Sequence, residues 1–175
     1  YVPKVPGYDR SCSPGRGCSF GPAWSDDVDQ EFGHNGCDTR NDILRRDLTK
    51  AEVAPNTRGC VVLSGTLHDP YTGQVVAFRK GANGVQIDHL FPLAAAWDRG
   101  AWEWSAEDRR NFANDPANLQ ATTTAINTSK SDKLPGDWMP PVGRCDYARR
   151  VAEVADKWHL VLTSRDVAAL RGCAD

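Results

Sequence analysis

Asp88 and His89 stand side by side, directly after the short apolar run Val85-Gln86-Ile87. A carboxylate can bind a divalent cation through oxygen, and an imidazole, with an unperturbed pKa of about 6.5, can accept a proton from water. Side chains point alternately to the two faces of a strand, so Asp88 can face a metal ion while His89 faces an incoming water. The pair could supply two parts that metal-assisted hydrolysis of a phosphodiester needs, a metal ligand and a general base. Taken alone it is a weak signal, because such dipeptides are common and often only satisfy local hydrogen bonds.

The segments around this pair must hold it rigidly. Residues 60–67 and 74–79 are rich in β-branched side chains and flank a turn composition at 69–73, so they predict a hairpin. A third short strand is expected over 85–88, and one more over 118–121. The predicted fold class is α+β, with a small antiparallel sheet surrounded by helices and loops that disulfides hold in place.

Helices are expected on both sides of these strands. Asp38 is a suitable N-cap for a helix over 38–48, and Ser105 opens a capping-box pattern for a helix over 105–113. The C-terminal region repeats apolar residues at helical spacing. The remaining predicted helices cover 92–99, 122–130, and two within 146–175, the first carrying Tyr147, Val151, Val154, Ala155 and Trp158 and the second starting at Thr163 or Ser164.

A chain of 175 residues has the length of one domain, and we expect a single domain over 1–175. Residues 1–36 are rich in Gly, Pro, Ser and Asp and lack sustained periodicity, which predicts an irregular N-terminal arm. The proline-rich stretch 133–141 predicts a loop. No apolar run approaches the roughly 20 residues that a membrane span requires.

Six cysteines occur without any Cys-x-x-Cys pair, and this even count favours disulfides over a zinc or redox site. We expect each to pair with its neighbour in sequence, because such bridges close loops within one local unit. The first residues lack both a starting Met and the layout of a signal peptide, so we expect a secreted protein whose signal has been removed. The predicted bridges are Cys12–Cys18, Cys37–Cys60 and Cys145–Cys173.

Several motifs together resemble the HNH nucleases, whose active site is a ββα-metal unit. The resemblance covers roughly residues 37–141 and is closer still to a branch of secreted actinobacterial members. It implies a ββα-metal core over 85–130. The motifs that carry it are Ile87-Asp88-His89-Leu90-Phe91-Pro92-Leu93, Asn118-Leu119 and Asn127-Thr128-Ser129-Lys130, together with Gly36-Cys37-Asp38-Thr39-Arg40-Asn41, Phe112-Ala113-Asn114-Asp115-Pro116 and Asp132-Lys133-Leu134-Pro135 with Trp138.

The resemblance assigns a role to each polar residue of this set. It makes His89 the general base, Asp88 and Asn127 the ligands of one metal ion, and Asn118 the residue whose side chain or loop orients the imidazole. Asn127 stands where the eponymous pattern has its last His, so the second ligand is an oxygen. We therefore expect Mg²⁺ or Mn²⁺, because hard cations prefer oxygen ligands.

The formal net charge of −2 means that nucleic-acid contacts must depend on local positive patches. The segment around Arg40 suggests that this guanidinium contacts a substrate phosphate, an anion that the arginine fork binds well. Arg109, Lys130 and Lys133 are expected to line a groove for the substrate. Each of the four has an alternative as an ordinary surface charge.

The predicted protein is a secreted, monomeric endonuclease that hydrolyses DNA, with RNA left open, and leaves 5′-phosphate and 3′-hydroxyl ends with little sequence specificity. Two alternatives remain. A non-catalytic secreted nucleic-acid-binding protein could use a nuclease-like fold. A zinc hydrolase of another substrate is the second, although the sequence lacks a His-Glu-x-x-His helix.

Overall fold

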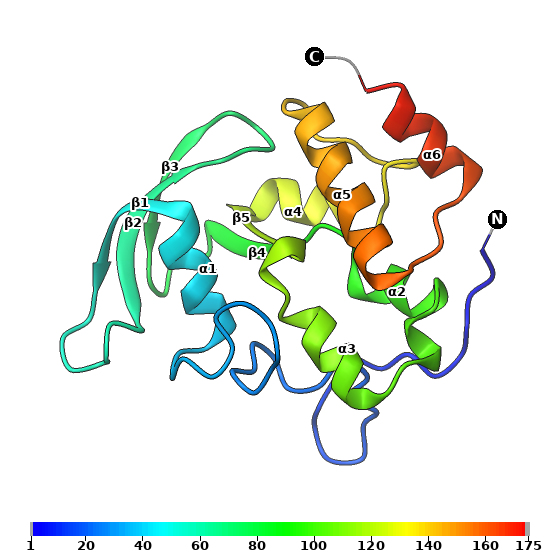
Figure 1. The fold of residues 1–175 in the computed structure, drawn as a ribbon. Coiled ribbons are helices and arrows are strands. Elements are labelled where there is room, and N and C mark those ends of the chain that lie inside the picture. Colours follow the sequence, from blue (N-terminus) through cyan, green and yellow to red (C-terminus); the bar gives the residue numbers. More distant parts are fainter. Residues whose placement is uncertain (1, 174–175) are drawn as a thin grey trace.

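The protein is described here from a computed structural model, which covers residues 2–173 in detail. The chain has an α+β arrangement, as the sequence predicts, with four consecutive strands after the first helix and mostly helices thereafter (Figure 1). The elements are α1 (Thr39–Asp47), β1 (Leu48–Val53), β2 (Val62–His68), β3 (Val75–Arg79), β4 (Val85–His89), α2 (Leu93–Asp98), η1 (Ala101–Glu103), α3 (Ala106–Ala113), η2 (Pro116–Asn118), β5 (Leu119–Thr123), α4 (Thr124–Lys130), α5 (Arg144–Trp158) and α6 (Ser164–Arg171).

Within residues 2–173, the strands form two antiparallel sheets. One has the order β1-β2-β3, and the other pairs β4 with β5. In the second sheet Asp88 lies opposite Gln120, and His89 lies opposite Leu119. Because β5 runs directly into α4, these three elements form a ββα unit within residues 85–130. The three-stranded sheet lies at one side of this unit, and α5 and α6 lie at the other (Figure 1).

Local sequence explains where most of these elements begin. The Asp38 side chain accepts a hydrogen bond from the Asn41 amide and so caps α1. Ser105 caps α3 in the same way, by accepting from the Asp108 amide. The predicted hairpin, both strands of the ββα unit, and the predicted helices are all present with small shifts at their ends.

Two apolar clusters support the ββα unit. One packs α1 against both sheets and includes Ile43, Leu67 and Ile87. The other packs α2, α3 and α5 together and includes Phe112 and Val151. The ββα unit lies between them, so its backbone is fixed from both sides.

Two of the predicted disulfides are present: Cys12–Cys18 in the arm and Cys37–Cys60, which ties the start of α1 to the start of β2. The third predicted pair, Cys145 with Cys173, is not a disulfide among the described residues. Cys145 lies in the first turn of α5, whereas Cys173 follows the end of α6. The expectation that every cysteine pairs with its sequence neighbour was therefore wrong for the last two.

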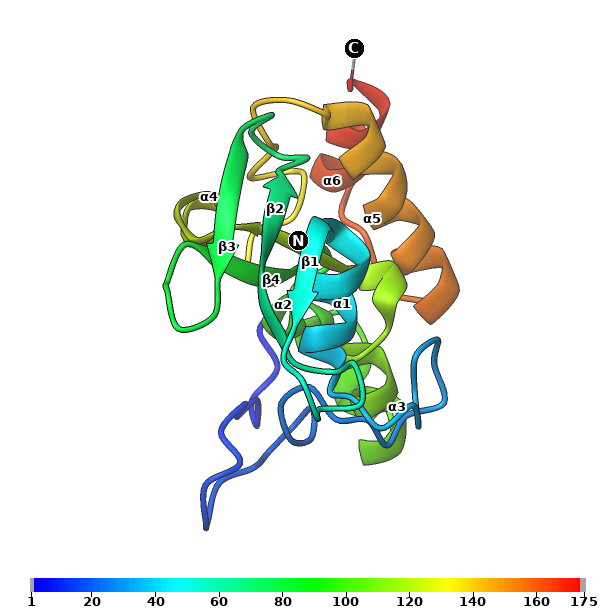
Figure 2. The ribbon, with the colours of Figure 1, turned by 90° about the vertical axis from the view of Figure 1, so that its left-hand side faces the viewer.

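The N-terminal arm, residues 2–36 in the described part, runs past α2 and beneath α3 before it reaches α1 (Figures 1 and 2). It is irregular, as predicted, but it is firmly packed. Phe20 is buried, and its ring contacts the Phe112 ring at a centroid distance of 6.1 Å. No helix among residues 2–173 is long and apolar enough to cross a membrane.

Asp166, in the first turn of α6, fixes the C-terminal helix to the rest of the domain. It is 2% exposed and accepts hydrogen bonds from Arg99 (2.7 Å) and from the Gly136 amide (2.9 Å). Burial alone would raise the pKa of Asp166, but the hydrogen bonds from Arg99, Thr163 and Gly136 outweigh burial and lower it.

We expect Asp166→Asn to lower the free energy of unfolding by about 1–3 kcal/mol at pH 7, because buried donors lose their anionic acceptor. A carboxylate with a lowered folded pKa stabilises the protein above its unfolded pKa of about 3.9, and this stability is lost as the pH falls through the folded pKa. The difference between variant and wild type, measured by urea denaturation, should therefore shrink toward acid pH. Asp156→Asn, at an exposed position of α5, is the control. If the free energy of unfolding of Asp166→Asn is lower than that of the wild type by the same amount at every pH, the lowered pKa assigned to Asp166 is wrong.

Candidate active site

Asp88, His89 and Asn127 line one cavity of about 210 Å³ on the ββα unit. Asp88 and His89 end β4, whereas Asn127 lies in α4. Three residues without a predicted role line the same cavity: Tyr8 and Arg10 from the arm, and Asp132 after α4. The strand, the helix and the arm therefore meet at this cavity.

The imidazole of His89 is held on two sides. Its Nε2 lies 2.8 Å from the carbonyl oxygen of Ala113 at the end of α3. The Trp24 ring from the arm stacks on it, with 5.6 Å between centroids and 5° between planes. A carbonyl can only accept, so Nε2 carries the hydrogen and Nδ1 keeps a lone pair that can take a proton.

Burial lowers the pKa of His89 to about 3, with smaller contributions from the charges of Arg10 and Lys130, while the bond to Ala113 opposes the shift. The imidazole is therefore neutral at physiological pH. A neutral imidazole in a fixed tautomer is the form that a general base requires.

The carboxylate of Asp88 is 4% exposed and accepts two hydrogen bonds. Lys130 Nζ lies 3.1 Å from Oδ1, and the Tyr71 hydroxyl donates to Oδ2 over 2.7 Å. Burial raises the pKa of Asp88, and the nearby Lys130 ammonium is the largest effect that opposes the rise. Each carboxylate oxygen has a second lone pair, so both oxygens can still bind another partner.

Lys130 has a different position from the predicted one. We expected it to line a groove for the substrate, but its side chain is completely buried. Its ammonium contacts Asp88 and also donates to the carbonyl oxygen of His89 over 2.9 Å. Lys130 therefore cannot reach a substrate on the surface of this structure, and it holds the end of β4 instead.

Tyr71 lies in the turn between β2 and β3, and its hydrogen bond to Asp88 connects this turn to the site. The turn is anchored by Asp69, which accepts a hydrogen bond from the Thr122 hydroxyl in β5 (2.7 Å). Gly143 allows the turn to pack against the start of α5, because a Cβ there would stand 2.8 Å from the carbonyl oxygen of Pro70. The sequence indicated this segment only as a hairpin turn.

Asn118 fixes the backbone that follows His89. Its Oδ1 accepts from the Phe91 amide (2.7 Å), and its Nδ2 donates to the Phe91 carbonyl (3.0 Å). Its own carbonyl accepts from the Leu90 amide (2.9 Å). The contacts of Asn118 are with the loop after His89, so any influence on the imidazole passes through that loop.

Asn127 and Asp88 are the oxygen donors predicted to bind a metal ion. The Asn127 amide nitrogen donates to Gln86 Oε1 over 2.8 Å, which directs the nitrogen away and leaves the amide oxygen available. Among residues 2–173, no three His, Cys, Asp or Glu side chains form a group that could bind a metal by themselves. One carboxylate and one amide oxygen, completed by water and phosphate oxygens, suit Mg²⁺, which usually retains several waters.

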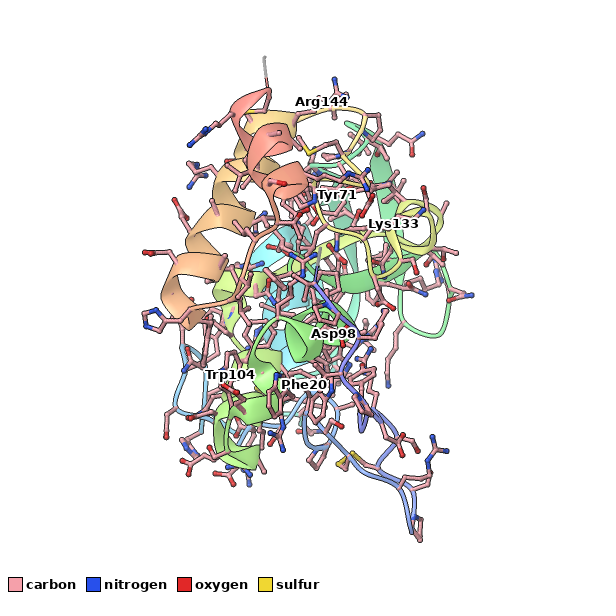
Figure 3. All side chains as sticks on the ribbon, turned by 90° about the vertical axis from the view of Figure 1, so that its right-hand side faces the viewer. Phe20, Tyr71, Asp98, Trp104, Lys133 and Arg144 are labelled. Carbon is pink, nitrogen blue, oxygen red and sulfur yellow. A yellow bond between two sulfur atoms is a disulfide. The ribbon has the colours of Figure 1, made fainter. Side chains whose placement is uncertain are left out.

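The other predicted substrate contacts lie outside this cavity. Arg40 lies over the Phe78 ring at 6.0 Å, on the three-stranded sheet. Arg109 donates to the carbonyl oxygens of Ser19 and Trp104, so its guanidinium joins the arm to α3. Lys133 is exposed beyond α4 (labelled in Figure 3). Arg109 thus has a structural role instead of the predicted one, and contact of Arg40 or Lys133 with substrate stays a prediction.

Sequence reasoning missed Tyr71, Asp132 and Arg10. Asp132 had a signal, because it lies in one of the motifs that carry the resemblance. Tyr71 and Arg10 had none, since neither lies in a motif that carries the resemblance and only the fold brings them near the Asp-His pair.

Comparison with known proteins gives one family and one relative. Residues 38–168 match the family described as "GmrSD restriction endonucleases, C-terminal domain". This match extends into α6, beyond the region 37–141 in which the motifs were found. The chain is also 38% identical over 138 residues to an "Uncharacterized secreted protein" from Arthroderma benhamiae, and the alignment covers 77% of this chain but 65% of that protein. No solved structure matches.

The Asp88–Lys130 pair yields a test of stability. We expect Lys130→Met to lower the free energy of unfolding by about 3–5 kcal/mol, because it leaves a buried carboxylate without its counter-ion. Lys133→Met, at an exposed position three residues further along, is the matched control. It should change the free energy of unfolding by less than about 0.5 kcal/mol. Urea denaturation of both variants makes the comparison. Equal stability of the two variants would mean that the buried pair contributes nothing.

Proposed function

This chain belongs to the family formed by the C-terminal domains of GmrSD restriction endonucleases, which is of the HNH type, and from that membership we propose that it is a divalent-metal-dependent endonuclease. The observation that carries the proposal is that His89, Asp88 and Asn127 line one cavity together. It combines a neutral imidazole in a fixed tautomer with two kinds of oxygen donor. These are the groups that metal-assisted phosphodiester hydrolysis requires.

Each residue of the cavity has one role in the proposed reaction. His89 Nδ1 accepts a proton from the attacking water, and the hydrogen bond from Nε2 to Ala113 keeps the ring in place while it does so. Asp88 and Asn127 would hold the metal ion, which supplies stabilisation of the charge that develops on the phosphate and on the leaving 3′ oxygen. Asn118 positions the loop after His89. The products are a 5′-phosphate and a 3′-hydroxyl.

We propose DNA as the substrate, with RNA tested beside it. We expect little sequence specificity, because the sequence contains no recognisable base-reading module. The relative from Arthroderma benhamiae is named a secreted protein, and this chain has two disulfides. Both observations support an extracellular location. We further propose that the protein acts as a monomer with one Mg²⁺ or Mn²⁺. The closer relationship to secreted actinobacterial members, which the motifs suggested, stays a prediction.

His89→Ala should reduce the rate of plasmid cleavage by about 10²–10⁴-fold, the usual contribution of a general base. His89→Gln, which keeps a donor for the Ala113 carbonyl, should be impaired to a similar degree. His68→Ala, at an exposed histidine in β2, is the control and should keep full activity. Circular dichroism verifies that the variants fold. A folded His89→Ala protein with normal activity would exclude this residue as the base.

Asn127→Ala should raise the Mg²⁺ concentration needed for half-maximal cleavage by roughly tenfold or more, because one oxygen ligand is lost. The measurement is a Mg²⁺ titration of plasmid cleavage. Asn83→Ala, in the exposed turn before β4, is the matched control. An unchanged Mg²⁺ requirement in Asn127→Ala would remove Asn127 from the metal site.

A further inference from the structure

Arg10 in the N-terminal arm lies at the proposed catalytic cavity, and its positive charge acts on His89 there. It lines both the cavity that contains Asp88 and Asn127 and a smaller one of about 40 Å³ beside Trp24, and His89 lines both as well. Among residues 2–173, its guanidinium has no hydrogen-bond or ion-pair partner, and the side chain is exposed. Arg10 is therefore an available cation next to the proposed general base.

The backbone on both sides of Arg10 is fixed. Tyr8 packs against Phe20 and Trp97, each at a centroid distance of 6.1 Å. The Asp9 amide donates to the Ser19 hydroxyl (2.9 Å), and the Ser19 amide donates to the Asp9 carbonyl (2.8 Å). Arg10 thus starts from an anchored position, and less conformational entropy is lost when its guanidinium binds a ligand.

The segment after Arg10 is a closed loop. The Cys12–Cys18 disulfide joins its two sides, and the Cys18 amide donates to the Ser11 carbonyl (2.9 Å). Asp9 accepts two hydrogen bonds from Arg16, at 2.7 and 2.8 Å. The other arginine of this loop is therefore already paired with a carboxylate, whereas Arg10 is not.

Besides the metal ion proposed there, a cationic side chain would favour the entry of an anionic ligand into the catalytic cavity, because carboxylates line it. Asp88 and Asp132 both line it, and Arg10 is the only Arg or Lys among its described lining residues. Lys130 is buried against Asp88, and Arg109 is bonded to carbonyl oxygens, so neither can bind a phosphate there. A guanidinium can donate two parallel hydrogen bonds to phosphate oxygens.

We propose that Arg10 binds a backbone phosphate of the nucleic acid at the cleavage site, so that the disulfide-closed arm forms one side of the substrate cleft. This inference depends on the proposed nuclease function and adds a residue outside the family match at 38–168. Arg10 contributes to substrate binding and lies beside the reacting atoms, while Asp88, His89 and Asn127 keep the roles given above.

The test measures binding of a short fluorescein-labelled DNA duplex in the His89→Ala background, by anisotropy at salt concentrations from about 50 to about 200 mM. Adding Arg10→Ala should weaken binding several-fold and reduce the slope of log K against log salt by about one, because one phosphate contact is lost. Arg10→Lys should restore the slope, since an ammonium also neutralises a phosphate. Adding Arg144→Ala, at the exposed start of α5 and far from Phe20 and the arm, should leave binding unchanged (Figure 3).

Equal affinity and slope with and without Arg10→Ala would overturn the proposal for Arg10. Cleavage of plasmid by the wild-type protein, measured in parallel, separates this outcome from failure of the nuclease function. If the wild type cleaves DNA but Arg10→Ala has no effect on binding, only the role of Arg10 is wrong. If the wild type does not cleave DNA and the His89→Ala protein does not bind the duplex, both proposals are wrong.

Discussion

The buried ion pair of Asp88 and Lys130 is the interaction on which the proposed site depends. Removing two charges from water costs several kcal/mol per ion, and the cost is offset only when both charges are paired and hydrogen-bonded. Here Lys130 also donates to the His89 carbonyl, and Asp88 also accepts from Tyr71. The pair therefore joins the end of β4, the end of α4 and the turn between β2 and β3 at one point.

This constraint explains how a chain with two small sheets holds a precise site. The backbone at His89 is fixed by Lys130 from one side and by Asn118 through the following loop from the other. The ring is fixed by elements that are remote in sequence, the end of α3 and the stacked Trp24 of the arm. Each support comes from a different segment, so the orientation of the imidazole depends on the complete fold.

The sequence predicted the parts of the fold that local rules control. The caps at Asp38 and Ser105, the hairpin strands and the adjacent Asp-His pair all follow from residue types at short spacing. Strand β1 was missed, because Leu48–Val53 continues directly from α1, its apolar residues do not alternate regularly, and its pairing with β2 contains register irregularities. The burial of Lys130 was missed as well, because a lysine is normally exposed and only tertiary contacts show its counter-ion.

We propose above all that the cavity at the end of β4 hydrolyses phosphodiester bonds with a divalent metal ion. Incubation of the wild-type protein with supercoiled plasmid, in Mg²⁺ or Mn²⁺ and in excess chelator, tests it most directly. We expect nicked and linear products ending in 5′-phosphate when either metal is present, and intact plasmid with chelator. Intact plasmid under every metal tested, or cleavage that persists with chelator, would contradict it.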